Sequence, residues 1–198
     1  MNAADETFRL ILIAGALIVF PVAIYHRLKA HSVREKLDRW KEGPFILFTL
    51  RPVGIAVMLG LFTYMVNPAR MAWSSMPLPV WVRWVGVGIA ALGGMLFVWT
   101  FRNLGKNLTD TVVTRREHTL VMTGPYRWVR HPFYVAAALA MVGNALAAAN
   151  WFLLGGGVLV FTLMAIRVRI EEAELLARFG GAYRAYMDRT HRFVPRLR

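Results

Sequence analysis

The chain has 198 residues, a formal net charge of +13 and no cysteine, and 57% of its residues are hydrophobic. A chain of this length fits one domain, and its hydrophobic share lies above the usual range for soluble domains. The lack of cysteine excludes disulfides, thiolate metal sites and a cysteine nucleophile in these residues.

Four apolar runs dominate the sequence, at residues 8–25, 44–66, 78–101 and 133–166. A bilayer core needs roughly 20 apolar helical residues, so each of the first three runs predicts one transmembrane helix. The fourth run is too long for one span and predicts a tight helical hairpin with slightly short arms, turning near Ala148-Ala149-Asn150. The expected fold is therefore an all-α integral membrane protein with five transmembrane helices, of which the fourth and fifth form the hairpin.

The polar segments between the runs predict shorter elements. Residues 28–42 carry apolar side chains among charges at roughly helical spacing, which is typical of an amphipathic helix on the membrane face. Residues 111–121 favour a short extended or hairpin element. Residues 169–187 predict a cytoplasmic amphipathic helix with a break at Gly180-Gly181.

We expect the chain to have two parts. Residues 1–101 hold the first three transmembrane helices with their cytoplasmic amphipathic connector, and residues 102–198 form the catalytic half, with a cofactor loop, the hairpin and a C-terminal cytoplasmic helix. In the third run, Gly86, Ala90 and Gly94 recur every four residues, and small residues at this spacing predict a close contact between helices.

Basic residues are concentrated in alternate connections. They gather at residues 27–41, at 102–130 and in the tail from Arg167, whereas residues 67–77 and the hairpin turn hold few. This is the positive-inside pattern, which predicts an outer N-terminus and a cytoplasmic C-terminus in a bacterial-type inner membrane. The expected partner of the surplus charge is the lipid bilayer with its anionic headgroups, and not nucleic acid.

Two polar clusters bracket the fourth apolar run. Residues 123–134 combine turn formers, aromatic rings, two arginines and a histidine, and residues 167–172 combine arginines with a pair of glutamates. Because a hairpin returns to the face from which it started, both clusters would meet the same water. This arrangement predicts an active site at a membrane surface.

The clusters also carry a family resemblance. His118-x-Leu120-Val121, Gly124-Pro125-Tyr126 and Arg130-His131-Pro132-x-Tyr134, followed by Arg167 and Glu171-Glu172, resemble the isoprenylcysteine carboxyl methyltransferase and phospholipid methyltransferase family. The resemblance implies an integral membrane enzyme that uses S-adenosyl-L-methionine to methylate a lipophilic or small membrane-permeant acceptor, a carboxylate, amine or thiol, at the cytoplasmic face. By this resemblance the catalytic residues are Arg130, Arg167 and Glu172, and the cofactor-binding residues are His118, Leu120, Val121, Gly124, Tyr126, His131, Tyr134, Glu171 and Glu172.

The chemistry of these residues is compatible with such a cofactor. Proline after His131 marks a helix start, whose next backbone N–H groups, from residues 133–135, would bind the cofactor carboxylate or simply be capped. Glu171 and Glu172, near a span end, need cationic or hydroxylic partners, either from the cofactor or from neighbouring arginines. Aromatic rings in the first cluster suit a sulfonium cation or anchor the chain at the interface. Histidine spacing supports no metal site.

Alternatives remain at this point. Ala136 stands where the family commonly has glycine, and its methyl group is expected to tighten the cofactor site. An intramembrane NADPH-dependent ene reductase shares a similar His-Pro-x-Tyr segment, although Phe133 here replaces its usual asparagine. A non-catalytic membrane adaptor is the third possibility. The few polar groups in the hairpin arms predict that the acceptor arrives sideways from the bilayer.

Overall fold

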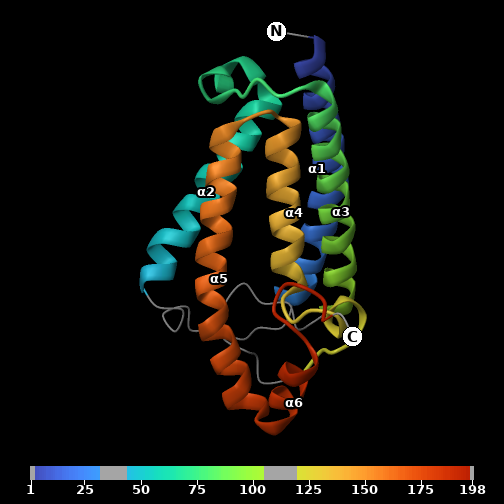
Figure 1. Cartoon of the computed structure of the whole chain (residues 1–198), viewed down its shortest axis with the longest axis vertical. Coiled ribbons are helices and arrows are strands. Elements are labelled where there is room, and N and C mark those ends of the chain that lie inside the picture. Colours follow the sequence, from blue (N-terminus) through green and yellow to red (C-terminus); the bar gives the residue numbers. More distant parts are fainter. Residues whose placement is uncertain (1–2, 32–43, 105–119, 197–198) are drawn as a thin grey trace.

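The structure, a computed structural model, describes residues 3–31, 44–104 and 120–196 and is all-helical over these residues (Figure 1). Two isolated bridges, Ser75 with Asn150 and Val129 with His191, supply its β-type pairing. The elements are α1 (Ala3–His31), α2 (Pro44–Val66), the 3-10 helix η2 (Pro68–Ser74), α3 (Val80–Leu104), the 3-10 helix η4 (Gly124–Arg127), α4 (Pro132–Ala147), α5 (Trp151–Phe179) and α6 (Gly181–Arg189).

The predicted membrane fold is confirmed in its class. In the described residues, α1, α2, α3 and α5 are each long and apolar enough to cross a bilayer. Helix α4 has 16 residues, roughly 24 Å at the helical rise, which is shorter than a bilayer core of about 30 Å. It lies between α3 and α5 (Figure 1), so four helices reach the length of a full span and the fifth crossing stays a prediction.

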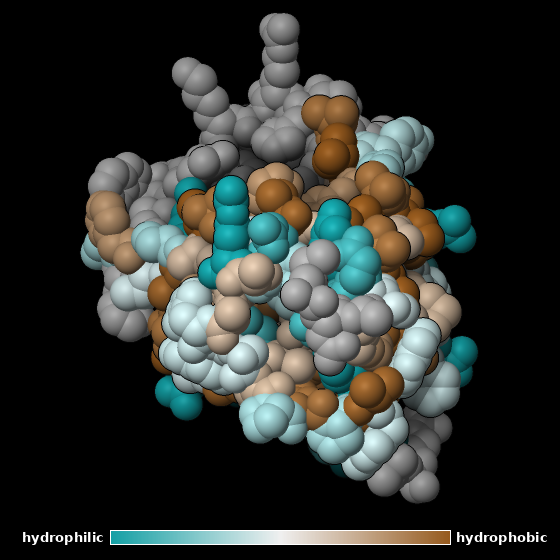
Figure 2. All heavy atoms as spheres, turned by 90° about the horizontal axis from the view of Figure 1, so that it is seen from above, coloured by the Kyte–Doolittle hydropathy of each residue, from teal (hydrophilic) through white to brown (hydrophobic). Residues whose placement is uncertain are grey.

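Apolar side chains also cover the outside of the bundle. Leu17, Phe48 and Trp81 are among many large hydrophobic residues that remain exposed, as expected for helices that face lipid. A view along the bundle, onto the end that carries the N-terminus, shows hydrophilic and hydrophobic residues mixed on this end face (Figure 2).

Helices α3 and α4 approach closely through small residues. A Cβ atom added to Gly86 would lie 2.6 Å from the backbone nitrogen of Ala147, and one added to Gly93 would lie 2.7 Å from that of Ala140. Gly94, which the sequence placed on the same face, instead meets Val19 of α1. The predicted close contact is thus present, but the helix turns Gly93 rather than Gly94 toward α4.

The hairpin turn lies where the sequence predicted it. Helix α4 ends at Ala147, and Asn150 caps α5 by accepting a hydrogen bond from the backbone N–H of Leu153 at 3.0 Å. Ala149 takes a positive φ of 48°, an uncommon backbone conformation for a residue with a Cβ atom. The side-chain amide of Asn150 donates to the hydroxyl of Ser74 at 2.7 Å, which fastens the turn to η2.

The second arm differs from expectation, because α5 continues without interruption from Trp151 to Phe179. The residues predicted as a helix over 169–187 are helical, but their first half continues the fifth apolar helix, since no proline or glycine follows Gly157 until Gly180. The expected break occurs at Gly180, with φ at 52°, and α6 follows. Glu171 and Glu172 therefore sit inside a helix and two turns from its end, beyond the reach of its C-terminal dipole.

A buried arginine joins four helices at the end that carries the N-terminus. Arg83 of α3 donates to the carbonyl of Ala147 at 2.9 Å, to Asp5 at 2.8 Å and to the hydroxyl of Tyr64 at 3.1 Å. Its guanidinium also lies 4.1 Å from the ring centre of Phe8. Since each donor nitrogen has a partner, the charge is compensated, and α1, α2, α3 and α4 are held in register here.

At the opposite end lie the C-terminal end of α1, the start of α2, the C-terminal end of α3 and the start of α4 (Figure 1). The connections that the sequence marks as basic therefore leave the bundle at one end. The predicted amphipathic helix at 28–42 falls mostly on residues outside the described ranges, although α1 itself continues to His31. The extended element predicted at 111–121 also lies almost wholly outside them.

Candidate active site at one end of the bundle

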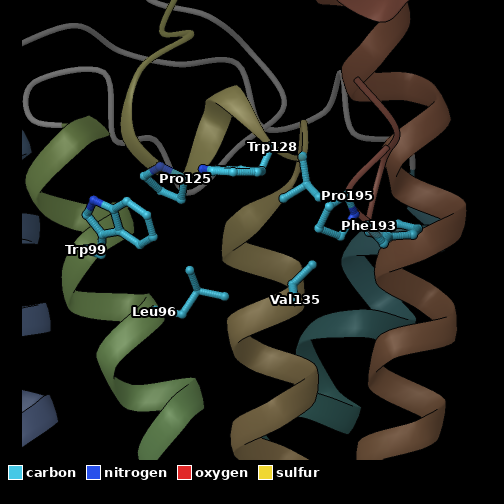
Figure 3. A pocket seen from close by; sticks show the side chains of 8 residues that line it. Leu96, Trp99, Pro125, Trp128, Val135, Phe193 and Pro195 are labelled. Carbon is cyan, nitrogen blue, oxygen red and sulfur yellow. The ribbon is translucent and has the colours of Figure 1, made fainter. Parts of the chain in front are cut away.

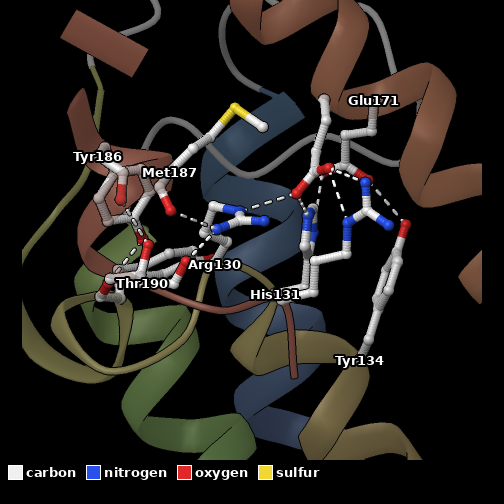
Figure 4. A network of polar contacts seen from close by, with 10 residues as sticks. Arg130, His131, Tyr134, Glu171, Tyr186, Met187 and Thr190 are labelled. Carbon is white, nitrogen blue, oxygen red and sulfur yellow. Dashed lines mark hydrogen bonds and ion pairs between the residues drawn. The ribbon is translucent and has the colours of Figure 1, made fainter. Parts of the chain in front are cut away.

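The two polar clusters of the sequence meet at the end of the bundle away from the N-terminus. His131 is the N-cap residue of α4, and Glu171 and Glu172 lie on α5. The imidazole Nε2 of His131 is 3.4 Å from Glu172, and its Nδ1 is 3.9 Å from Glu171 (Figure 4). The hairpin thus brings together side chains that are about forty positions apart.

Glu172 is the centre of the buried ion pairs. Its Oε1 accepts a hydrogen bond from the Nε of Arg130 at 2.8 Å, and its Oε2 accepts two from Arg192, at 2.8 Å and 2.6 Å. The side chains of Glu172 and Arg130 are only 5% and 9% exposed. Both oxygens of Glu172 therefore accept hydrogen bonds from arginines of the chain itself. Of the two kinds of cationic partner expected for this glutamate, the structure shows neighbouring arginines.

Glu171 is placed differently. Its Oε2 accepts the hydroxyl of Tyr134 at 2.8 Å, and the carboxylate side chain is 29% exposed. The ring of Tyr134 stacks on that of His131, with centres 5.4 Å apart. Glu171 thus combines a fixed orientation with access, whereas Glu172 is enclosed.

The backbone at the start of α4 is more fully satisfied than the sequence suggested. The N–H groups of Tyr134 and Val135 both donate to the carbonyl of His131, at 3.1 and 3.3 Å. The prediction that these two groups are unpaired and bind an anion is therefore wrong, because the N-cap carbonyl of His131 turns inward and accepts them. The N–H of His131 donates to the carbonyl of Arg192 at 3.0 Å.

The tail after α6 belongs to the site, and the sequence analysis missed it. Besides the ion pairs of Arg192, the ring of Phe193 stacks on Tyr134, with centres 6.4 Å apart, and tilts against Phe161 at 5.4 Å. The bond to Glu172 raises the pKa of Arg192 above its ordinary value. The available signal was an Arg-Phe pair shortly after the predicted helix, but the position of this pair depends on the turn at Gly180.

Arg130 fastens this tail to the helices. In addition to its bond with Glu172, its Nη1 donates to the carbonyl of Met187 at 3.1 Å and to that of Thr190 (Figure 4). The N–H of Arg130 donates to the carbonyl of His191 at 2.9 Å. Arg130 thus has four hydrogen-bond partners within the protein, and these contacts hold the tail against the start of α4.

Three tyrosines complete the surroundings. The hydroxyl of Tyr186 donates to the carbonyl of Tyr126 at 2.6 Å, and burial raises the pKa of Tyr186 to about 12. Burial and the negative charge of Glu171 raise the pKa of Tyr126. Burial also raises the pKa of Tyr183, whose buried hydroxyl has no hydrogen-bond partner within the described part of the chain. All three remain neutral at physiological pH.

The other residues implied by the family resemblance lie at varying distances from this centre. Leu120 and Val121 precede η4 and are partly buried. Gly124 has a φ of 58°, and a Cβ atom there would overlap the side chain of Asn103. Arg167 lies one turn before Glu171 on α5. His118 lies outside the described residues.

Ala136 does not face this cluster. The residue is fully buried, and its carbonyl is among the atoms nearest to a Cβ added at Gly93, which places it on the α3 side of α4. Tyr134 is two positions earlier, about 200° around the helix. The expectation that the methyl of Ala136 tightens the cofactor site is therefore wrong, because it points into the helix interface.

Comparison with known proteins places the chain in a family. Residues 81–182, about half of the chain, match the phospholipid methyltransferase family. The chain belongs to this family. The matched residues run from the start of α3 into α6, so they include the small-residue helix contact, both polar clusters and the hairpin.

Several individual proteins are similar to more than half of the chain. The chain is 34% identical over 115 residues to the nickel-cobalt-cadmium resistance protein NccN of Alcaligenes xylosoxydans xylosoxydans, covering 58% of this chain and 53% of that protein. It is 30% identical over 118 residues to protein-S-isoprenylcysteine O-methyltransferase B of Arabidopsis thaliana, covering 58% and 60%. The chain thus spans about half the length of the curated relatives it matches.

A solved structure shares the fold. The eukaryotic intramembrane Ras methyltransferase ICMT superposes with a TM-score of 0.60 at 20% identity, over 95% of this chain and 67% of that one. At this identity the likeness concerns the fold alone. Family and fold together make this family member an integral membrane protein, as the resemblance in the sequence implied.

Proposed function

We propose that this protein transfers a methyl group from S-adenosyl-L-methionine to a lipophilic or small membrane-permeant acceptor at the cytoplasmic face of the membrane. The observation that carries the proposal is the convergence of Glu171, His131 and Tyr134 at one end of an apolar helix bundle. Membership of a methyltransferase family favours this activity over the reductase alternative. The acceptor's reacting group remains a carboxylate, amine or thiol.

The residues at the site suit the proposed cofactor by the chemistry of their donors and acceptors. Glu171 offers a partly exposed carboxylate for an ammonium or for ribose hydroxyls. The rings of Tyr134 and His131 are buried and stack on each other, so their part is to orient Glu171 through the hydroxyl of Tyr134. The buried hydroxyl of Tyr183 has no hydrogen-bond partner in the described residues and is a donor suited to a polar ligand atom. When bound, S-adenosylmethionine supplies an electrophilic methyl group on a sulfonium.

Glu171 and Glu172 have different roles in this proposal. Glu171, with its exposed oxygen, is the ligand-facing carboxylate in this proposal. Glu172, saturated by Arg130 and Arg192, is a positioning residue that fixes the tail against the start of α4. A cationic ligand group reaches Glu172 only by displacing Arg192, whose side chain is 43% exposed and so the easier of the two to release.

The protein's own contribution is alignment and exclusion of water. Holding two reactants in line can supply a large share of a rate enhancement without acid or base chemistry. A carboxylate acceptor has no proton to lose. For an amine or thiol acceptor, Glu171 is the proposed group that takes the proton, and the hydroxyl of Tyr134 orients its carboxylate. Arg167, one turn before Glu171, is the proposed cation for an anionic acceptor group.

Binding measurements on the protein in lipid nanodiscs test this function. Titration with S-adenosylmethionine, S-adenosylhomocysteine and NADPH should give binding of the first two and none of the third. Glu171→Gln, Tyr134→Phe and His131→Ala should each weaken S-adenosylhomocysteine binding at least tenfold, about 1.4 kcal/mol. Glu174→Gln, on the same helix, is the matched control. NADPH binding alone, or wild-type affinity in all three folded variants, would contradict the proposal.

The orientation of the site is part of the proposal. A cytoplasmic cofactor requires the polar end of the bundle to face the cytoplasm, and the basic connections at that end support this. The chain lacks cysteine, so single exposed cysteines report their side directly. Ser75→Cys should react with an impermeant maleimide added outside intact cells, and Arg184→Cys should not. The reverse pattern would place the site on the wrong side for the cofactor.

A further inference from the structure

An apolar cavity of about 450 Å³ lies beside the polar cluster and extends across the start of α4, from the end of α3 to the tail (Figure 3). Its walls come from the end of α3, from η4 and the residues after it, from the start of α4 and from the tail. The lining side chains include Leu96, Trp99, Trp128, Val135, Phe193 and Pro195. The volume falls within the range of roughly 300–1,000 Å³ that is usual for small-molecule sites.

The chemistry of the walls restricts what this cavity can hold. Every lining residue is apolar, and the one polar group among the side-chain types present is the indole N–H. A hydrated ligand would leave its polar groups without partners there, whereas a hydrocarbon loses nothing. Trp99 and Trp128 are about half exposed, at 47% and 50%, and tryptophan is the residue type favoured at a membrane–water interface.

The side chain of Phe193 contacts both the cavity and the polar cluster. The ring of Phe193 lines the cavity, and it also stacks on Tyr134 at 6.4 Å and lies 6.1 Å from the ring of His131. The position of this ring is fixed by its neighbour, because Arg192 is bound to Glu172 through its side chain and to the N–H of His131 through its carbonyl. Phe193 is thus a wall held in place from the polar side.

We propose that this cavity receives the apolar part of the methyl acceptor, a single hydrocarbon chain or small ring system, and that Phe193 sets how far the acceptor reaches toward Tyr134 and Glu171. The inference rests on the proposed methyl transfer and names the substrate class of that same site. It places the apolar part of the acceptor between the end of α3 and the tail, beside the start of α4. Phe193 acts as a specificity-determining residue.

Occupancy of the cavity is testable without any enzyme activity. In the naturally cysteine-free chain, Val135→Cys places a thiol in the cavity wall, and Met95→Cys places one on the exposed face of α3 as the matched control. In nanodiscs, n-dodecanol should slow maleimide labelling of the first variant by about threefold or more, as mass action predicts when an occupant exceeds its Kd severalfold, and leave the second unchanged. Equal rates with and without n-dodecanol, or equal slowing at both positions, would overturn the proposal.

The wall is tested by changing its size. Phe193→Ala should shift methylation in a series of n-alkanethiols toward longer or bulkier members, measured as the ratio of rates for long and short members at saturating S-adenosylmethionine. Val194→Ala, one exposed position further, should not shift this ratio. If Phe193→Ala weakens S-adenosylhomocysteine binding and leaves the acceptor preference unaltered, the wall belongs to the cofactor site and the inference is wrong.

The proposed function and the assignment of the cavity are contradicted by different results. A wild-type protein that binds no S-adenosylhomocysteine contradicts the proposed function, whatever the cavity contains. A protein that binds it, but shows no protection of Val135→Cys by n-dodecanol, contradicts only the assignment of the cavity. If none of the n-alkanethiols is methylated, the labelling result decides whether the cavity accepts a hydrocarbon.

Discussion

Removal of Glu172 should cost more folding stability than removal of Glu171, whereas removal of Glu171 should weaken ligand binding more. Glu172→Ala leaves Arg130, only 9% exposed, without its charged partner. Removing one partner of a buried ion pair typically costs about 3–5 kcal/mol. Arg130 keeps the carbonyls of Met187 and Thr190, which favours the lower end of that range. Arg192 adds little because its side chain is 43% exposed and water can solvate it. We therefore expect a loss of about 3 kcal/mol of folding free energy.

Glu171→Ala provides the comparison. It removes one hydrogen bond from Tyr134 to a partly exposed carboxylate, for which about 1 kcal/mol is the expected loss. The difference of about 2 kcal/mol corresponds to roughly a thirtyfold change in the unfolding equilibrium. For S-adenosylhomocysteine binding the order should reverse, because Glu171 is the ligand-facing group and Glu172 acts through the position of the tail.

Equilibrium unfolding in mixed micelles, followed by tryptophan fluorescence, measures the first effect, and titration of the folded fraction measures the second. The conservative Glu172→Gln variant, which keeps the volume and one acceptor oxygen, should lie between wild type and Glu172→Ala. Equal destabilisation by both alanine variants, or a greater loss from Glu171→Ala, would refute the assignment of Glu172 as the enclosed partner.

Three further changes probe the scaffold. Gly86→Leu should destabilise the fold by about 3 kcal/mol or more through overlap with the α4 backbone, whereas Gly88→Leu, with open space around it, should not. Unfolding in mixed micelles measures both variants, and equal losses of folding free energy would contradict the close contact between α3 and α4. Arg83→Ala should cost about 3 kcal/mol of stability by the same measurement yet preserve S-adenosylhomocysteine affinity per folded molecule, since it lies at the opposite end of the bundle. Tyr186→Phe should cost about 1 kcal/mol at neutral pH. Because burial raises the pKa of Tyr186 from 10.0 to about 12, the stability this hydroxyl supplies is complete below pH 10 and declines as pH rises toward 12. Denaturation curves should show a smaller decline for the variant than for wild type, because Tyr126 and Tyr183, whose pKa values are also raised, remain in both.

Much of the architecture could be predicted from the sequence, because membrane insertion depends on local composition. Runs of apolar residues specify helices wherever water is excluded, since their backbone groups must bond within the segment. The same local logic located the turn at Ala148–Asn150 and the break at Gly180. It also placed the two polar clusters together, because a hairpin necessarily returns both of its ends to one side.

Rotation and contact between elements required the tertiary structure. Whether Ala136 faces the cofactor cluster or α3, and whether Gly93 or Gly94 meets α4, depends on the phase of one helix against another, and single residues change that phase by about 100°. The length of α5 likewise placed Glu171 and Glu172 beyond the last apolar turn rather than at a helix terminus, where a dipole would act on them.

The composition of the site itself was decided by the return of the tail. Apolar runs, basic connections and the motif from Arg130 to Tyr134 are properties of neighbouring residues, so the sequence by itself determined a membrane bundle with its polar chemistry at one end. The ion pair of Arg192 with Glu172 and the wall formed by Phe193 join residues twenty or more positions apart through the turn at Gly180 and the packing of α6. Only the folded chain fixes such contacts, because they depend on the summed geometry of every element between the two partners.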